Sequence, residues 1–142
     1  MTPSEIRTAI NADPAILALV PDTQAIADAL SAGRTKIGEV TAHNIRQYLT
    51  LIGLLIPIED ATAMSCREAA RVLEIFPIID LANPMIAGKF NQVLTDLVDE
   101  TLLPDFTEEH KQTILSFAYH PDPVGEMDVR KALWSDDGVL LL

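Results

Sequence analysis

Cysteine and histidine, the residues that most often ligate metals or act as nucleophiles, are few and isolated in this sequence. It contains one cysteine, Cys66, and three histidines, which lie far apart at His43, His110 and His120. No two histidines have the i, i+4 spacing with which a helix presents two ligands to a metal ion. We expect the histidines to be surface or helix-capping side chains, and we predict no metal and no cofactor.

The other patterns that support catalysis are also missing. Cys66 follows Ser65 and precedes Arg67, which can lower the thiol pKa slightly, but no nucleophile elbow surrounds it. The glycines form neither a GxGxxG nor a Gly-Lys-Ser pattern for binding phosphates. Neighbouring carboxylates occur, but acid–base catalysis needs a cleft that perturbs them. We predict that Cys66 is a packed side chain and that the protein is not an enzyme.

An acidic segment without lysine or arginine runs from residue 96 to residue 109. Its carboxylates are Asp96, Asp99, Glu100, Asp105, Glu108 and Glu109. The simpler interpretation is a solvated face, in which acids near the start of a helix interact favourably with the helix dipole. The alternative is a contact surface for a basic partner, or a face that mimics DNA.

An apolar segment, Val139–Leu142, follows Trp134 and a polar turn that contains glycine. Exposed leucines favour association with another surface. The segment can fold back onto its own core, or it can dock in extended form on a neighbouring chain. The candidate partner-contact residues here are Trp134, Val139, Leu140, Leu141 and Leu142.

Composition excludes several classes of protein. Asp and Glu number 21 against 10 Lys and Arg, which gives a net charge of -11. This balance argues against binding to nucleic acid and to anionic membranes, both of which require clustered basic residues. Hydrophobic residues make up 49% of the chain, as in a globular protein. A single cysteine permits no internal disulfide and suits a reducing compartment.

The sequence contains no targeting or membrane segment that we can identify. The first residues lack the basic and apolar regions of a secretory signal peptide. The most apolar stretch, Leu49–Ile58, contains Gly53 and Pro57, and it is far shorter than the roughly 20 residues of a membrane span. We therefore expect a soluble protein.

Helix-start signals recur along the chain. Thr2-Pro3-Ser4-Glu5 predicts a capping box, Asp13-Pro14 and Asp22 predict two further starts, and Gly33 predicts a left-handed helix end. These three short helices would form an N-terminal cap, residues 1–34, with too little buried area to be stable alone. Residues 35–40 would form a linker that can run extended.

Apolar side chains at helical spacing continue after the linker, and period-two alternation is absent. The predicted helices run from Thr41 to Pro57, from 60 or 62 to Phe76, from Asn83 to about Asp99, from Thr107 to about 118, and from about Glu126 to Trp134. We predict an all-α fold, a compact bundle of about six to eight short helices. Its domains would be the cap, the linker, a main helical domain at 41–134 and a C-terminal tail at 135–142.

Three segments together resemble small, poorly characterised all-helical proteins of tailed bacteriophages. They are the opening from Thr2 to Pro14, the segment from Ile26 to Thr35, and the segment from Pro121 to Leu133. Residues 79–103 also fit in order, whereas Thr41–Phe76 matches least well. The resemblance implies a phage origin and a non-enzymatic role, and it transfers no binding or catalytic residue.

The leading functional hypothesis is a structural or assembly protein that acts as an adaptor in the virion, in the tail or neck. Its partners would be other virion subunits or further copies of itself, contacted through the N-terminal cap and the C-terminal tail. The alternative is a phage regulator or anti-defence protein in the host cytoplasm, which binds a host protein through the acidic segment. A bacterial helical interaction module unrelated to phage is a third possibility.

Overall fold

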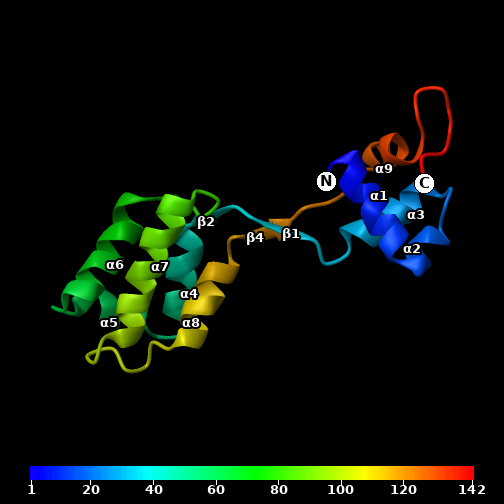
Figure 1. The fold of residues 1–142 in the computed structure, drawn as a ribbon. Helices are drawn as coiled ribbons and strands as arrows, with labels where there is room; N and C mark the ends of the chain where they lie inside the picture. Colours follow the sequence, from blue (N-terminus) through cyan, green and yellow to red (C-terminus); the bar gives the residue numbers. More distant parts are fainter. The chain divides into compact units, whose positions relative to one another are not determined.

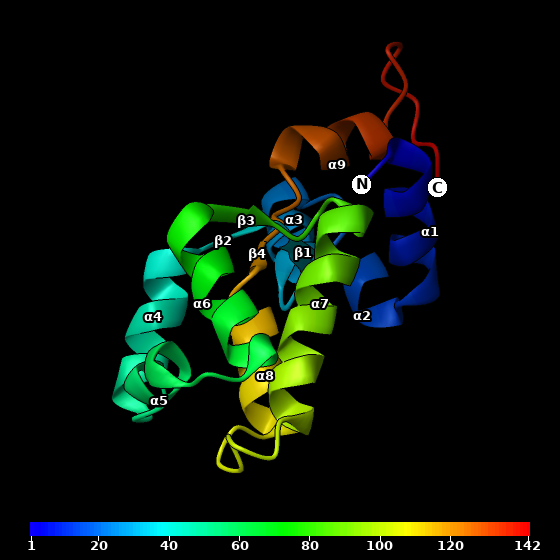
Figure 2. The same ribbon diagram turned by 90° about the vertical axis from the view of Figure 1, so that its left-hand side faces the viewer.

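The structure, a computed structural model, describes residues 1–142 and is dominated by α-helices, which hold 59% of the residues (Figures 1 and 2). Its elements in order are α1 (Pro3–Ala12), α2 (Pro14–Leu17), α3 (Thr23–Ser31), β1 (Thr35–Ile37), β2 (Glu39–Thr41), α4 (Ala42–Leu51), α5 (Leu55–Asp60), α6 (Met64–Ile75), β3 (Ile78–Asp80), α7 (Pro84–Asp99), α8 (Glu108–Ser116), β4 (Tyr119–Pro121) and α9 (Glu126–Leu133).

The strands correct the expectation of a strictly all-α fold. β2 pairs antiparallel with β3, with Val40 opposite Ile79, and β1 pairs with β4 in a second two-stranded sheet. Each strand has only three residues, so none is long enough to show alternation in the sequence. The partners are also far apart in the chain, and only the folded protein brings them together.

The chain folds into two compact units, divided differently from the expected domains. Unit 1 comprises residues 1–35 and 121–142, and unit 2 comprises residues 36–120. Helix α9, which we expected in the main domain, packs against α1 and α3 in unit 1. The N-terminal helices bury too little surface by themselves, and α9 supplies the missing part of their core.

The unit 1 core is built from both ends of the chain. Its fully buried aliphatic side chains include Ile6 and Ile10 of α1, Ile26 of α3, and Val129 and Leu133 of α9. They recur at helical spacing on one face of each helix, so the three faces close on one another. Unit 1 therefore needs the segment after residue 120 in order to fold.

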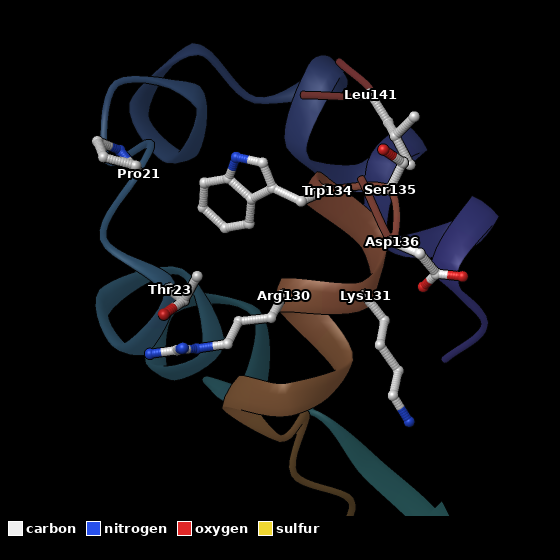
Figure 3. A pocket seen from close by; sticks show the side chains of 8 residues that line it. All are labelled: Pro21, Thr23, Arg130, Lys131, Trp134, Ser135, Asp136 and Leu141. Atoms are coloured by element: carbon white, nitrogen blue, oxygen red, sulfur yellow. The ribbon is translucent and has the colours of Figure 1, made fainter. Parts of the chain in front are cut away.

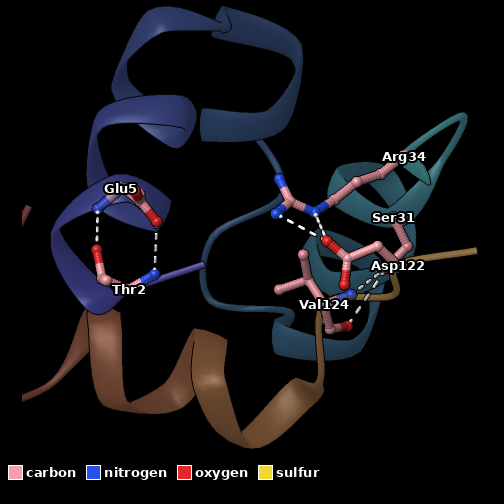
Figure 4. A network of polar contacts seen from close by, with 6 residues as sticks. All are labelled: Thr2, Glu5, Ser31, Arg34, Asp122 and Val124. Carbon is pink, nitrogen blue, oxygen red and sulfur yellow. Dashed lines mark hydrogen bonds and ion pairs between the residues drawn. The ribbon is translucent and has the colours of Figure 1, made fainter. Parts of the chain in front are cut away.

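The predicted capping box at the start of α1 is confirmed. The Glu5 amide donates to Thr2 Oγ1 at 3.2 Å, and the Thr2 amide donates to Glu5 Oε2 at 2.7 Å (Figure 4). This second bond is the main cause of the lowered pKa of Glu5. The predicted cap at Asp22 and the left-handed Gly33, with φ of 69°, are present too.

Polar contacts hold residues 122–124, where the chain re-enters unit 1, to the end of α3 and the turn after it. The Arg34 guanidinium forms an ion pair with Asp122 at 3.0 Å (Figure 4). The Val124 amide donates to Ser31 Oγ at 2.8 Å. These bonds fix the segment that leads into α9, so its apolar face meets the N-terminal helices in one register.

Unit 2 has its own core between α4, α5, α6, α7 and α8. Phe106 and Ile114 are buried completely or almost so, together with Leu97 of α7 and Ile45 of α4. Cys66 of α6 lies in the same core with no exposed surface. The side chain is packed, as predicted. Burial raises the pKa of its thiol, whereas the sequence suggested that Arg67 could lower it slightly.

The prediction that Pro57 ends a helix is wrong. Helix α4 ends at Leu51. Gly53 follows with φ of 76°, a left-handed conformation that favours glycine. Pro57 then lies in the first turn of α5, where its missing N–H costs no helical hydrogen bond. The apolar stretch is thus divided between two short helices, and the structure contains no helix with the length and apolar character needed to cross a membrane.

Candidate functional site

The C-terminal segment folds back on α9 through backbone hydrogen bonds. The Ser135 amide donates to the Val139 carbonyl at 2.9 Å, and the Leu141 amide donates to the Leu133 carbonyl at 2.6 Å. Gly138, with φ of 78°, forms the turn between them. The tail is therefore held within its own unit by its backbone.

Its side chains, however, remain open to solvent. Val139 is 60% exposed, Leu140 46%, Leu141 44% and Leu142 37%. Four neighbouring apolar side chains on a hydrogen-bonded backbone form an exposed patch of the kind that binds other proteins.

Beside this patch lies a hollow of about 740 Å³, which we call the Trp134 pocket (Figure 3). Its lining comes from the turn before α3, the start of α3, α9 and the tail. The residues are Pro21, Thr23, Arg130, Lys131, Trp134, Ser135, Asp136 and Leu141. The indole of Trp134 extends toward Pro21, while the Lys131 side chain points away from it.

A three-residue network fixes one wall of the Trp134 pocket. Glu126 Oε1 accepts hydrogen bonds from Thr23 Oγ1 at 2.7 Å and from Arg130 at 2.9 Å. The hydrogen bond from Thr23 is the main cause of the lowered pKa of Glu126, and the hydrogen bond from Arg130 is the second. Both stabilise the ionised carboxylate. Arg130 is thereby paired within α9, and both Arg130 and Lys131 remain exposed.

Half of the predicted acidic residues are engaged within unit 2. Glu100 accepts a hydrogen bond from Ser65 Oγ at 2.8 Å and another from the Leu102 amide, and these lower its pKa. Glu108 has a lowered pKa because it accepts from Gln112 at 2.9 Å and lies near Lys111. Asp96 accepts from Gln92 at 2.8 Å.

Lys111 changes the character of this region, and sequence reasoning overlooked it. Its residue is only 8% exposed, and its ammonium donates to Thr95 Oγ1 at 3.0 Å and lies 3.4 Å from Glu108. A buried cation beside the acidic segment offsets part of its charge. The carboxylates that remain exposed are Asp99, Asp105, Glu108 and Glu109, and of these Glu108 is paired with Lys111.

The chain between α7 and α8, which we call the α7–α8 loop (residues 100–107), presents one exposed leucine. Leu102 is 68% exposed, whereas Leu103 and Phe106 are 3% and 1% exposed and anchor the loop to the core. The loop projects beyond the ends of α7 and α8 in both views (Figures 1 and 2). Exposed Asp99 and Asp105 lie on either side of Leu102 in the sequence.

The histidines lie apart, and two of them have structural contacts. His110 completes a capping box with Thr107, whose amide lies 3.2 Å from His110 Nδ1, and capping is one of the two roles expected for the histidines. His120 Nε2 lies 2.7 Å from the Glu39 carbonyl oxygen. His43 is exposed in the first turn of α4.

The structure brings Trp134 and the tail together, in keeping with the alternative in which the tail folds back on its own chain, and it adds residues that the sequence did not indicate. Thr23 and Glu126 are 103 residues apart, and no local motif connects them. Arg130 and Lys131 look like ordinary basic residues near a helix end. Their role in lining a pocket follows only from the packing of α9 on α3.

Comparisons of the chain with family models, with curated proteins and with solved structures find no match.

Proposed function

We propose that this protein is a non-enzymatic structural or assembly component of a tailed phage and acts as an adaptor in the tail or neck of the virion. It would bind another protein through the patch formed by Val139–Leu142 and the adjoining Trp134 pocket. The observation that supports this most directly is the exposure of four apolar side chains on a segment whose backbone is already ordered.

Preorganisation makes this patch suited to binding. A disordered apolar tail loses conformational entropy when it docks, and that loss weakens binding. Here the hydrogen bonds of Ser135 and Leu141 fix the backbone before any partner arrives. The neighbouring Trp134 is the residue type most enriched among binding hot spots.

The test is quantitative mass spectrometry of nuclease-treated, gradient-purified particles of the phage that encodes the chain. The wild-type protein should be present at a reproducible integral ratio to a portal or tail protein. A double variant, Leu140→Ser with Leu142→Ser, should be lost from the particles, because the apolar contact is removed while helical content is unchanged.

The matched control is the double variant Leu51→Ser with Ile56→Ser. These two aliphatic side chains belong to unit 2 and are 81% and 69% exposed. These changes remove more exposed apolar surface than the tail variant does, since Leu140 and Leu142 are 46% and 37% exposed, and they should leave incorporation intact. Normal incorporation of the tail variant would remove the tail from the mechanism.

Absence of the wild-type chain from particles, together with abundance in infected cells, would overturn the virion proposal. That result would favour the regulator hypothesis instead. Binding to a host protein would then depend on Asp99, Asp105 and Glu109, and charge reversal there would abolish it.

A further inference from the structure

We propose that the free edge of β3 and the groove beside it bind an extended segment of another protein, in which apolar and basic side chains alternate. The bound segment would add one strand to the β2–β3 sheet. The site lies in unit 2 and shares no residue with the tail or the Trp134 pocket, so this inference goes beyond the proposed function. An adaptor that joins two partners needs a second contact surface of this kind.

Strand β3 has one edge paired with β2 and one edge without a partner strand. The Ala42 amide donates to the Pro77 carbonyl at 2.9 Å, so the main chain of residue 77 faces β2. Main-chain groups of an antiparallel strand alternate in direction, so residues 79 and 81 also face β2, whereas Ile78 and Asp80 face away from it. We call the outward-facing main chain of Ile78 and Asp80 the β3 edge.

The β3 edge carries main-chain groups that have no hydrogen-bond partner within the chain. They are the amide and the carbonyl of Ile78 and the amide of Asp80, while the Asp80 carbonyl accepts from the Asn83 amide at 3.3 Å. Unpaired groups in this arrangement form a template for a strand from another chain. On the other side of the sheet, the Glu39 carbonyl oxygen already lies 2.7 Å from His120 Nε2.

A groove of about 430 Å³ lies between α6, β3 and α7, and we call it the α6–α7 groove (Figure 2). Its apolar lining residues are Val72, Phe76, Ile78, Ile79, Ile86, Phe90 and Val93. Phe76 and Ile78 are 53% exposed and Ile86 is 40% exposed, so the groove is open to a ligand. Side chains of an added strand that lie on the same face as Ile79 point toward this groove, because successive side chains alternate between the faces.

The charges at this site favour a basic segment. Glu39 lies directly opposite Asp80 in the β2–β3 register, so both side chains lie on the same face of the sheet. Glu68 lines the groove, and Lys89 is the only basic residue that does so. Three carboxylates therefore surround one ammonium group, and a lysine or arginine opposite Asp80 forms a favourable cross-strand pair.

The arginines of α6 do not cancel this excess. Arg67 and Arg71 line a separate hollow on α6, where Glu59 and Glu74 balance their charge. Neither arginine lines the α6–α7 groove.

The same charges disfavour a second copy of this chain as the occupant. Pairing between two β3 edges would gather Glu39 and Asp80 of both copies in one small sheet, and each copy has a net charge of -11. The apolar tail of a second copy follows Asp136 and Asp137, so it also brings negative charge. The segment that fits is therefore part of a different, basic protein.

The experiment titrates the full chain at low salt with a blocked synthetic peptide in which valine and lysine alternate, and it follows the backbone amides by NMR. The amides of Ile78 and Asp80 should exchange with solvent about tenfold more slowly, or more slowly still, when the peptide is bound. A peptide in which valine and glutamate alternate should bind about tenfold more weakly. Added salt should weaken binding of the lysine peptide.

A charge variant tests the choice of peptide. Asp80→Asn retains the oxygen that accepts from the Ala82 amide at 3.0 Å but removes the charge, and Glu68→Lys reverses the charge on exposed α6. The double variant should bind the lysine peptide about tenfold more weakly and should prefer the glutamate peptide. Glu74→Lys, on α6 but outside the groove, is the control and should retain the wild-type preference.

A second pair of variants tests the groove. Ile86→Ser removes apolar surface from its wall and should weaken binding of the lysine peptide severalfold. Ile75→Ser is the matched control, because Ile75 is 53% exposed on α6 and does not line the groove. Equal effects of the two substitutions would exclude the groove from the binding site.

Three outcomes would overturn the inference. Binding that leaves the exchange of Ile78 and Asp80 unchanged would exclude strand addition, and equal binding of the lysine and glutamate peptides would exclude the charge-based choice of partner. Protection of these amides that increases with protein concentration, without any peptide, would show that a second copy covers the edge. None of these readouts involves the tail, so the result is independent of whether the chain enters particles.

Discussion

Glu126 of α9 links the two chain ends that form unit 1, because its carboxylate accepts from Thr23 of α3; the same oxygen also accepts from Arg130 within α9. Both donors favour the ionised form, and the pKa of Glu126 is accordingly lowered. A lowered pKa in the folded state means that the interaction stabilises the protein above the pKa of the unfolded chain. That stabilisation is lost as pH falls through the folded pKa.

We therefore expect Glu126→Gln to lower the urea midpoint of unit 1 at pH 7, since the amide can still accept from Thr23 but carries no charge. The difference from the wild type should shrink as pH falls below the ordinary glutamate value of about 4.3, where the wild-type carboxylate also becomes protonated. Fluorescence of Trp134, the single tryptophan, reports the transition. Glu59→Gln, on exposed α5, is the control, and a difference that is constant with pH would contradict the assignment.

At the scale of single residues, the sequence was informative about side chains with local partners. His110 lies three residues from Thr107, and its capping contact could be anticipated from that spacing. The sequence could not indicate that Leu102 is exposed and Leu103 buried, because both are leucines at the same corner. Packing against the unit 2 core decides which of the two is covered.

At the scale of elements, α7 shows how a cap and an apolar face combine. Asn83 Oδ1 accepts from the Met85 amide at 3.0 Å, and Pro84 occupies the first helical position. The helix then places Phe90, Val93, Leu94 and Leu97 in the unit 2 core. Both of its ends agree with the sequence prediction.

We predict that Asn83→Ala destabilises the protein by about 1 kcal/mol, because the first-turn amides lose their acceptor. The control is Asn91→Ala, the same substitution at an exposed position inside the same helix. That change should be neutral or slightly stabilising, since alanine has the higher helix propensity. Urea unfolding followed by circular dichroism measures both, and equal effects of the two substitutions would contradict a capping role for Asn83.

At the scale of the whole molecule, the division into two units has a consequence for stability. Ile26 and Ile114 are both 0% exposed, one in the unit 1 core and one in the unit 2 core. Each isoleucine-to-alanine change should cost about 2–5 kcal/mol through lost burial and the cavity that remains.

Because the cores are separate, the effects should be local. Ile26→Ala should speed hydrogen exchange in α1, α3 and α9, whereas Ile114→Ala should speed it in α4 to α8. Exchange read by mass spectrometry of peptides resolves the two patterns, and each variant is the control for the other. Faster exchange throughout the chain in both variants would show that the units unfold as one.

The sequence by itself determined the net charge, the helical character and most helix starts. A cap such as Thr2, Asp22 or Asn83 is completed by amides two or three residues away, so the information is local. Only the tertiary structure decided that α9 belongs with the N-terminal helices, that β2 pairs with β3, and that Trp134 lies in a pocket beside Thr23 and Lys131. The physical reason is that these contacts join residues far apart in the chain, and burial of the shared apolar faces selects them over other pairings.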